Sequence, residues 1–512
     1  MIKLLSFTTL DVLKKKQVDL INRRAPIFDR NGVVLASNLQ TFSAYINPRK
    51  IKNLHSFKQR MLKLGYVDIN KKLDLNREFI WLFKKLSPDE KKRIETAGIS
   101  EINFIEENKR ILPHGNLFSH VIGHVCEDGI GMSGIEKKYN NLLMSDGGGI
   151  KLTIDTRVQH YVRESLINGI KMHSAKSGAG IVIDVNTGEL LSIVSYPDFN
   201  PSNIKKSDKD KLVNWATYGA YEMGSSFKVL TIASALDSKS ISETDIIDAS
   251  KPLKIGKFTI RDYRGKGSAL SVEEVLMYSS NIGTAKIAQS MGKNLQYSYL
   301  QKLGLLSNIE SNVPYVASPI IGTWSDTRAL TTSYGHGIAV SPLHLITAIS
   351  AVVNGGVLCK PSIIFGESDC SSKVLKKETS LIMRKLMRLA VEKGSVKKAD
   401  VEGYNVAAKS GTAEKIIDGK YSKDENLVST VAVFPINEPK YVVLIMIDSP
   451  QKNFINKGFR TGGMVAAPVV SEIIRKIAPI LNVAPIRKTN KGDAFLQVHQ
   501  KNSYRFASAK SN

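Results

Sequence analysis

The feature that most restricts the fold is a set of apolar strand candidates at both ends of a long helical stretch. Two apolar runs flank Asn186-Thr187-Gly188, a pattern typical of a β-hairpin. Two further apolar runs, residues 427–435 and 441–450, come much later in the chain. The residues between these early and late runs follow a mostly helical pattern. Because strands that are distant in sequence can pair edge to edge, we expect an α+β fold with a largely antiparallel sheet packed between helices.

Length and local composition divide most of the chain into three segments. At 512 residues the chain is long enough for more than one domain. Residues 21–150 mix short β-type stretches with Lys-rich helical segments and are predicted to form an N-terminal α/β scaffold domain. A glycine cluster at 147–149 ends this segment, and residues 151–480 are predicted to form the second domain. Residues 481–512 are basic and polar, which predicts a loosely held tail.

Residues 1–20 form the remaining segment. They begin with a few apolar side chains, interrupted by Lys3, and continue with a basic cluster. This pattern fits the outer end of a membrane anchor as well as an ordinary amphipathic start. No run in the sequence reaches the roughly 18 to 20 apolar residues that a transmembrane helix requires. We therefore expect a membrane-proximal remnant here and no complete anchor.

The net charge is strongly positive. The chain has 72 Lys and Arg residues against 47 Asp and Glu residues, which gives a formal charge of +25. The basic residues are spread in short runs, without the aromatic side chains of a single-strand groove or a DNA-reading motif. A general attraction to anionic membranes or wall polymers explains the surplus. We expect no nucleic-acid partner.

The three cysteines are Cys126, Cys359 and Cys370, and they show no metal-ligand spacing. Their odd number predicts no disulfide framework. Elsewhere the sequence has no cluster of side chains with metal-ligand spacing, so we expect neither a metal nor a cofactor. A reducing compartment and an exported protein that is poor in cysteine both fit this content.

Residues 221–237 place two serines and a lysine at the start of an apolar, helix-prone run. If the helix begins at Ser225, then Ser225 and Lys228 project from the same face of its first turn. Such a pair can act as nucleophile and base, and the free N–H groups of a first helical turn favour a developing negative charge. The pattern Ser-x-x-Lys does not identify a site by itself. It occurs five times, beginning at Ser202, Ser225, Ser290, Ser395 and Ser449.

Two further segments distinguish the copy at Ser225 from the others. Residues 279–281 read Ser-Ser-Asn after an apolar run, and residues 409–412 read Lys-Ser-Gly-Thr at the end of a β-type run. The three patterns therefore follow one another as Ser-x-x-Lys, Ser-x-Asn and Lys-Ser/Thr-Gly. This order, on helix, loop and strand, is the signature of serine acyltransferases that act on β-lactams and D-Ala-D-Ala peptides.

With these motifs the chain resembles the class B penicillin-binding proteins over roughly residues 20–480. Residues 23–36, RRAPIFDRNGVVLA, resemble the first box of that branch, and residues 131–143 resemble its Gly-x-x-Gly-x-Glu segment. Residues 333–345 and 463–473 resemble its later helical regions. The division (FtsI-like) type of class B is the type that the chain resembles most.

The resemblance implies the fold, the location and the partners. It implies the transpeptidase fold of the penicillin-binding proteins over residues 151–480, with a pedestal domain over residues 21–150. The expected location is the periplasmic face of the bacterial inner membrane. The expected ligands are peptidoglycan stem peptides and β-lactams. The expected partners are a membrane-embedded glycan polymerase and other division proteins.

The resemblance also implies roles for the motif residues. Ser225 would attack the carbonyl between two D-alanines, Lys228 would take its proton, and Ser279 would pass a proton to the leaving amine. Lys228 must be neutral to act as a base, and burial and a second cation would both lower its pKa. Asn281 would orient the Lys228 amine. The terminal carboxylate of the substrate is expected to bind the third motif, made up of Lys409, Ser410, Gly411 and Thr412. Backbone N–H groups of Ser225 and Thr412 would form the oxyanion hole.

Three departures from the family pattern leave these roles intact. Ala25 stands where Gly is usual, Ser410 stands where Thr is commoner, and residues 459–461 replace an aromatic-glycine pattern. His336 is interpreted as a structural loop histidine. Asp29 and Asp155 are interpreted as turn and strand-edge residues.

Three alternative functions remain open on the sequence. The first is an elongation-type class B transpeptidase. The second is a β-lactamase or D,D-carboxypeptidase, which hands the acyl group to water. The third is a non-catalytic scaffold subunit of a wall-building complex.

Overall fold

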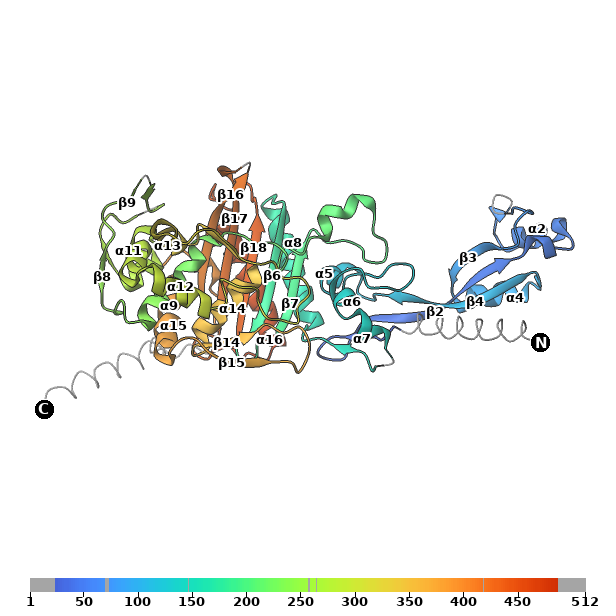
Figure 1. The fold of residues 1–512 in the computed structure, drawn as a ribbon, viewed down its shortest axis with the longest axis horizontal. Coiled ribbons are helices and arrows are strands. Elements are labelled where there is room, and N and C mark those ends of the chain that lie inside the picture. The colour runs from blue at the N-terminus through green and yellow to red at the C-terminus, as the bar shows by residue number, and fades with distance from the viewer. Residues whose placement is uncertain are drawn as a thin grey trace, which may run out of the picture.

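An antiparallel sheet made from two distant parts of the chain forms the centre of the C-terminal domain (Figure 1). The computed structural model describes residues 24–69, 73–145, 147–256, 258–263, 265–417 and 419–486. The five strands lie in the order β16 (Ala407–Ile417), β17 (Lys420–Phe434), β18 (Tyr441–Asp448), β6 (Ser177–Asp184) and β7 (Leu190–Tyr196). Strand β18 pairs with β6 from Tyr441 opposite Asp184 to Asp448 opposite Ser177. The α+β fold and the joining of the early hairpin to the late strands are thereby confirmed.

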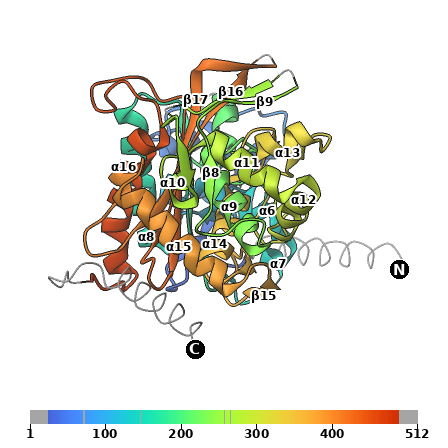
Figure 2. The same cartoon turned by 90° about the vertical axis from the view of Figure 1, so that its left-hand side faces the viewer.

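Helices cover both faces of this sheet (Figure 2). On one face lie α8 (Thr156–Met172) and α16 (Gly462–Ile480). On the other face lie α9 (Phe227–Asp237) and α14 (Pro342–Val353). Helices α8 and α16 turn an apolar face to the sheet, whereas α9 and α14 are buried along their whole length.

Strand β18 shows why its sequence is a continuous apolar run. Successive side chains of a strand point to opposite faces of the sheet. Val443, Ile445 and Ile447 enter the core shared with α8 and α16, whereas Val442 and Leu444 enter the core on the side of α9 and α14. A strand buried on both faces has no position at which a polar side chain would meet solvent.

Most of the remaining elements of this domain lie in the stretch between the early and the late strands. The helices are α10 (Val272–Met277), α11 (Asn281–Met291), α12 (Lys293–Lys302), α13 (Asp326–Thr332) and α15 (Lys377–Glu392). Short antiparallel strand pairs accompany them: β8 (Ile246–Asp248) with β11 (Ala269–Ser271), β9 (Leu253–Ile255) with β10 (Phe258–Ile260), β12 (Ile320–Ile321) with β13 (Ile338–Ala339), and β14 (Val357–Lys360) with β15 (Asp369–Lys373).

The N-terminal part of the chain extends away from the central sheet (Figure 1). Its long strand β2 (Val34–Ile46) pairs antiparallel with β3 (Ile80–Leu86) and β4 (Ile102–Ile111). Helices α2 (Leu54–Lys63) and α4 (Pro88–Thr96) pack there around a separate small core. Nearer the central sheet lie β1 (Ile27–Phe28), α5 (Ser119–Ile122), α6 (Gly134–Lys138), α7 (Asn140–Met144) and β5 (Ile150–Lys151).

A buried ion-pair group joins two of the segments that carry the family resemblance. The Glu136 carboxylate accepts hydrogen bonds from the guanidinium groups of both Arg24 and Arg110, the latter at 2.7 Å. The side chains of all three are at least 96% buried. Loss of one member of such a group leaves an uncompensated buried charge, which is strongly destabilising. The group therefore fixes the first box of the N-terminal domain against α6.

The cysteine prediction was wrong, because Cys359 and Cys370 form a disulfide. Their Cα atoms lie 4.0 Å apart on the paired strands β14 and β15. This proximity arises from the pairing of the two strands. The spacing of 11 residues in the sequence does not predict that pairing. Cys126 is not bonded to another cysteine.

The loop that the disulfide closes contacts the end of strand β5 and the residues just after it. The Ile363 carbonyl accepts a hydrogen bond from the Thr153 N–H, and the Phe365 N–H donates to the Lys151 carbonyl. Cys370 Sγ lies 3.2 Å from the carbonyl oxygen of Asn186, in the turn between β6 and β7. The disulfide thus closes a loop that joins residues 151–153 to the turn between β6 and β7.

One predicted boundary residue has a different role in the structure. Asp155 was expected at a strand edge, but strand β5 ends at Lys151 and Asp155 is the N-cap of α8. Its carboxylate accepts hydrogen bonds from the N–H groups of Arg157 and Val158. Asp29 lies in a turn as expected, where it accepts hydrogen bonds from the N–H groups of Asn31 and Val33.

The predictions for the two ends of the chain concern residues that are not described. Residues 1–20, the expected membrane-proximal remnant, and residues 487–512 of the tail lie outside the described ranges. Within those ranges, no helix combines the length and the apolar character that crossing a membrane requires. The division of the chain into segments at residues 20, 150 and 480 stays a prediction.

Replacing Cys359 by Ser should destabilise the C-terminal domain. The disulfide closes a loop whose ends are 11 residues apart, and opening such a loop costs about 3 kcal/mol in the free energy of unfolding. The thermal unfolding midpoint should fall by several degrees. The matched control is Cys126→Ser, which removes an unbonded thiol and should leave the midpoint close to that of the wild type. Equal midpoints for the two variants would contradict the disulfide.

Candidate active site

Three segments that are distant in sequence meet at one place in the C-terminal domain. Residues 225–228 lie on the 3₁₀ turn η4 (Gly224–Ser226) and the start of α9. Residues 279–281 lie between α10 and α11, and residues 409–412 lie on β16. Hydrogen bonds of side chains link all three segments. The motif order thus corresponds to one site in space.

The Lys228 amine is fully buried and makes three polar contacts in the second motif. Lys228 Nζ lies 2.5 Å from the Ser279 carbonyl oxygen, 2.7 Å from Asn281 Oδ1 and 3.1 Å from Ser279 Oγ. The carbonyl and amide oxygens can only accept hydrogen bonds, whereas the hydroxyl can also donate one. A neutral amine has two N–H donors and one lone pair, so it satisfies all three contacts.

Both lysines of the site have lowered pKa values. Burial, followed by the nearby charge of Lys409, holds the pKa of Lys228 well below its ordinary value of 10.5, while Asp262 acts in the opposite direction. Burial lowers the pKa of Lys409 to about 7. A lower pKa increases the share of the amine that is neutral, and so carries a lone pair, near neutral pH. Lys228 is therefore suited to act as a base.

Ser279 connects the two amines. Its Oγ atom lies 3.1 Å from Lys228 Nζ and 3.0 Å from Lys409 Nζ. Its backbone has a φ of +61°, in the left-handed region that costs a serine free energy. The strained turn points the carbonyl and the hydroxyl of one residue at the same lysine amine.

Two glycines allow η4 to lie directly against β16. A Cβ atom on Gly224 would lie 2.5 Å from the Thr412 carbonyl oxygen, and one on Gly411 would lie 2.4 Å from the Met223 carbonyl oxygen. Any larger residue at either position would push the two elements apart. The close approach brings the backbone of Gly224, the residue before Ser225, next to that of Thr412. This arrangement fits the expected oxyanion hole.

The two serines of η4 differ in their surroundings. Ser226 is buried, with its Oγ atom 3.5 Å from Ser429 Oγ, whereas Ser225 is partly exposed. The α-helix begins at Phe227, after a 3₁₀ turn that contains both serines. Among the hydrogen bonds of the described residues, none joins the hydroxyl of Ser225 to the amine of Lys228. That contact stays a prediction, and catalytic hydrogen bonds often tighten only when substrate binds.

Ser410 and Thr412 lie beside the start of α16. Both are partly exposed on β16, and Thr412 Oγ1 accepts a hydrogen bond from the Gly462 N–H at 3.1 Å. The Lys409 amine also donates to the Ser410 carbonyl at 3.0 Å. An amine that can be protonated and two accessible hydroxyls at a strand edge are groups that bind carboxylates. Their roles in binding stay predictions.

A loop that the motifs do not include supports η4. The Gly335 carbonyl accepts a hydrogen bond from the Gly224 N–H, and the Glu222 carboxylate accepts one from the Gly337 N–H. Burial lowers the pKa of His336, which lies between these two glycines. The glycines on either side of His336 were the sequence signal for this loop. The interpretation of His336 as a structural residue stays a prediction.

Asp262 is the site neighbour that sequence analysis missed. Its carboxylate accepts hydrogen bonds from Ser280 Oγ and from the Ile282 N–H. It lies 18 residues before Ser280 in a short irregular segment, outside each of the three motifs. No local pattern could have identified it, because its contacts appear only when this segment folds over the start of α11.

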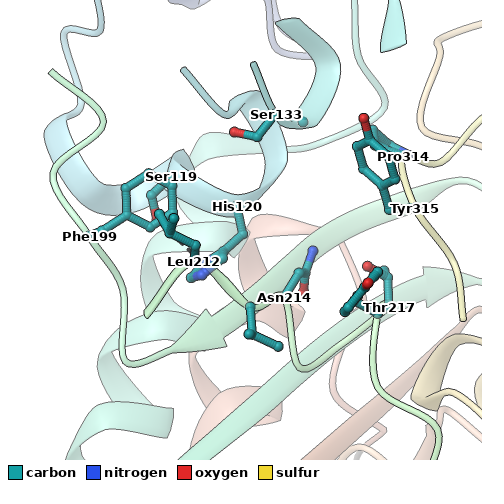
Figure 3. Close-up of a pocket in the computed structure, with 12 residues that line it drawn as sticks. Ser119, His120, Ser133, Phe199, Leu212, Asn214, Thr217, Pro314 and Tyr315 are labelled. Atoms are coloured by element: carbon teal, nitrogen blue, oxygen red, sulfur yellow. Dashed lines mark hydrogen bonds between the residues drawn. The ribbon is translucent and has the colours of Figure 1, made fainter. Parts of the chain in front are cut away.

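A cavity in the described part of the chain lies away from this site. A cavity of about 230 Å³ is lined by Ser119, His120 and Phe199, which lie close together, and by Thr217 (Figure 3). None of the predicted site residues lines it. Within the described part of the chain, no group of three or more His, Cys, Asp or Glu side chains is placed to hold a metal ion.

Two family models match the chain. The penicillin binding protein transpeptidase domain matches residues 178–475, and the penicillin-binding protein dimerisation domain matches residues 21–173. The chain belongs to the class B penicillin-binding proteins. The transpeptidase match includes all three motif segments. The resemblance inferred from the order of those motifs is thereby confirmed.

Relatives in this family match most of the chain. The probable peptidoglycan D,D-transpeptidase FtsI of Caulobacter vibrioides is 35% identical over 489 residues, which cover 91% of this chain and 82% of that protein. The peptidoglycan D,D-transpeptidase FtsI of Escherichia coli K12 is 26% identical, covering 90% of this chain and 84% of that protein. A peptidoglycan synthetase from Bifidobacterium adolescentis gives a TM-score of 0.73 at 21% identity, covering 93% of this chain and 98% of that one. This structural likeness supports the fold alone.

Replacing Lys409 by Met should stabilise the folded protein near neutral pH. Burial lowers the pKa of Lys409 from 10.5 to about 7, which at pH 7 costs the folded state on the order of 4 kcal/mol. Between pH 7 and 10.5 the unfolded state binds more protons than the folded state, so this cost shrinks as pH rises. The variant should therefore have a higher thermal unfolding midpoint at pH 7, and its advantage should decrease towards pH 10.

The matched control is Lys440→Met, since Lys440 is exposed on the surface. It should show no pH-dependent gain in the unfolding midpoint. A Lys409→Met midpoint that is lower than that of the wild type at pH 7, or a gain that does not change with pH, would contradict the burial of an ionisable amine.

Proposed function

We propose that this chain is a peptidoglycan D,D-transpeptidase that cross-links stem peptides through a serine acyl-enzyme. The observation that carries the proposal is the pair of buried amines, Lys228 and Lys409, that both contact Ser279 Oγ. A serine hydroxyl is a poor nucleophile until a base takes its proton. An amine that burial keeps neutral can take that proton at physiological pH. Family membership and relatives named as D,D-transpeptidases support the same reaction.

In the first step, Ser225 Oγ attacks the carbonyl between the two terminal D-alanines, and Lys228 Nζ takes the hydroxyl proton. The N–H groups of Ser225 and Thr412 stabilise the oxyanion, each by about 3 to 4 kcal/mol. The C–N bond then breaks. Ser279 gives a proton to the leaving D-Ala amine and receives one from Lys228, with which its hydroxyl is in contact. An ester between Ser225 and the stem peptide remains.

The substrate carboxylate binds Lys409 and the hydroxyls of Ser410 and Thr412. With a pKa of about 7, Lys409 is only partly charged in the free site. A bound carboxylate favours the ammonium form of Lys409, with which it forms an ion pair. Binding of a substrate with a free carboxylate therefore shifts Lys409 towards its charged form.

In the second step, an amine of a neighbouring stem peptide attacks the ester. Lys228 takes a proton from the attacking amine as the new peptide bond forms. The C–O bond of the ester breaks, and the proton returns to Ser225 Oγ. The free enzyme is restored and the two stems are cross-linked. A β-lactam enters only the first step, and its ring-opened acyl group remains on Ser225.

We infer that the protein works at the periplasmic face of the inner membrane, in septal wall synthesis during cell division. The disulfide between Cys359 and Cys370 supports this location, because disulfides form and persist in oxidising compartments such as the bacterial periplasm. Relatives named FtsI support the role in division. The expected partners are a membrane-embedded glycan polymerase and other division proteins.

Replacing Ser225 by Ala should lower the rate of covalent labelling by a fluorescent penicillin by at least about three orders of magnitude, because the variant lacks the nucleophile. The matched control is Ser226→Ala, which should label at a rate close to that of the wild type. Its hydroxyl contacts Ser429 and neither of the amines. Peptide mapping of the wild-type adduct should place the added mass on Ser225. An adduct that persists in Ser225→Ala would place the nucleophile elsewhere.

The lifetime of the penicilloyl adduct separates transfer from hydrolysis. A transpeptidase excludes water from the acyl-enzyme, so the adduct should persist for many minutes after free penicillin is removed. Intact mass measured over time gives this lifetime directly. Turnover within seconds would instead indicate a β-lactamase.

A further inference from the structure

The carboxylate of Asp262 accepts hydrogen bonds from the turn that carries the second motif. Asp262 follows β10 and lies over the N-terminus of α11. Its Oδ2 atom accepts a hydrogen bond from Ser280 Oγ at 2.7 Å, and its Oδ1 atom accepts one from the Ile282 N–H at 2.9 Å. The preceding carbonyl, of Arg261, accepts a hydrogen bond from Asn281 Nδ2 at 3.0 Å. Arg261 and Asp262 together therefore accept hydrogen bonds from all three of residues 280–282.

These hydrogen bonds hold in place the groups that contact the Lys228 amine. Ser280 Oγ also accepts a hydrogen bond from the Gly283 N–H and so caps α11. Ser279, which comes just before it, has the costly φ of +61°, and such a conformation persists only where its neighbours hold it. Ser279 and Asn281 supply the polar partners of Lys228 in this turn. If the turn relaxed, Lys228 would lose them together.

Asp262 also supplies a negative charge beside the buried amine. Burial and Lys409 lower the pKa of Lys228, and Asp262 raises it. Three elements bring charged or titratable groups towards Lys228: the segment after β10 with Asp262, strand β16 with Lys409, and the loop with His336. Of these groups, Asp262 is the anion. A base whose pKa falls too far accepts a proton poorly, so this charge limits the loss of basicity.

We propose that Asp262 is a positioning residue of the active site, which holds Ser279 and Asn281 against the Lys228 amine by way of Ser280 and the N-terminus of α11. The inference rests on the proposed function, because it assumes that Lys228 acts as the base. It gives a role to Ser280, the middle residue of the second motif. That residue connects Asp262 to the catalytic turn.

The acylation kinetics of the full chain with a fluorescent penicillin test this role. Asp262→Ala removes both carboxylate bonds and should lower the acylation rate constant about ten- to a hundredfold, the loss expected from a displacement of about 1 Å. The dissociation constant of the non-covalent complex should change little, because Asp262 acts on the base. The matched control is Asp248→Ala. Asp248 also bonds to α11, through Lys286, but it has no bond to the motif turn. This control should acylate at the wild-type rate.

The pH dependence separates this role from general stabilisation of the fold. Asp262→Asn keeps the shape of the side chain and removes the negative charge, so the pKa of Lys228 should fall further. The acid limb of the acylation rate should then move to lower pH, whereas Asp248→Asn should leave it in place. Circular dichroism and thermal unfolding of each variant show whether the fold is intact. If Asp262→Ala does not fold, Asp262→Asn carries the test.

A double-mutant cycle tests the route through Ser280. If Asp262 acts through the Ser280 hydroxyl, the losses from Asp262→Ala and Ser280→Ala should combine to less than their sum in free energy. Strictly additive losses would overturn the proposed route. Acylation by folded Asp262→Ala at the rate of Asp248→Ala, or an acid limb that does not move in Asp262→Asn, would overturn the role itself. A wild-type chain that penicillin does not acylate would overturn the proposed function instead.

Discussion

Two lysine amines buried against a single serine hydroxyl are the interaction on which the rest of the site depends. Lys228 is 0% exposed and Lys409 is 1% exposed, and both approach Ser279 Oγ to about 3 Å. Burial of an ammonium group is costly, and two of them side by side repel each other. Burial and mutual repulsion both destabilise the protonated amines and leave the neutral amines unaffected. The packing that lowers these pKa values therefore favours the neutral form that a base requires.

The surrounding fold holds this unfavourable arrangement in place. Gly224 and Gly411 let the nucleophile turn lie against strand β16, which is built into the central sheet. Asp262 accepts a hydrogen bond from Ser280, the residue next to the strained turn at Ser279. The loop closed by the disulfide contacts residues 151–153. The groups of the candidate site are thus held by contacts that are near in sequence, as between Asp262 and Ser280, and by contacts that are distant in sequence, as between Gly224 and Thr412.

The sequence predicted the features that can be read within short stretches. The apolar runs predicted the sheet, and the order of three short motifs predicted which of five Ser-x-x-Lys copies lies in the site. The features that failed or were missed depend on contacts that no local sequence pattern marks. The Cys359–Cys370 bond depends on the pairing of β14 with β15, and Asp262 reaches Ser280 only after its segment folds over α11. Asp155 was misplaced because β5 ends four residues before it.

The charge state of Lys228 in the free protein is the most direct test of the central claim. Nuclear magnetic resonance of protein with ¹³C-labelled lysine reports it through the shift of the ε-carbon, and Lys228→Arg identifies the signal. At pH 7 the Lys228 signal should be that of a neutral amine, titrating well below the ordinary pKa of 10.5. A signal that stays charged at pH 7 and titrates near 10.5 would contradict the claim.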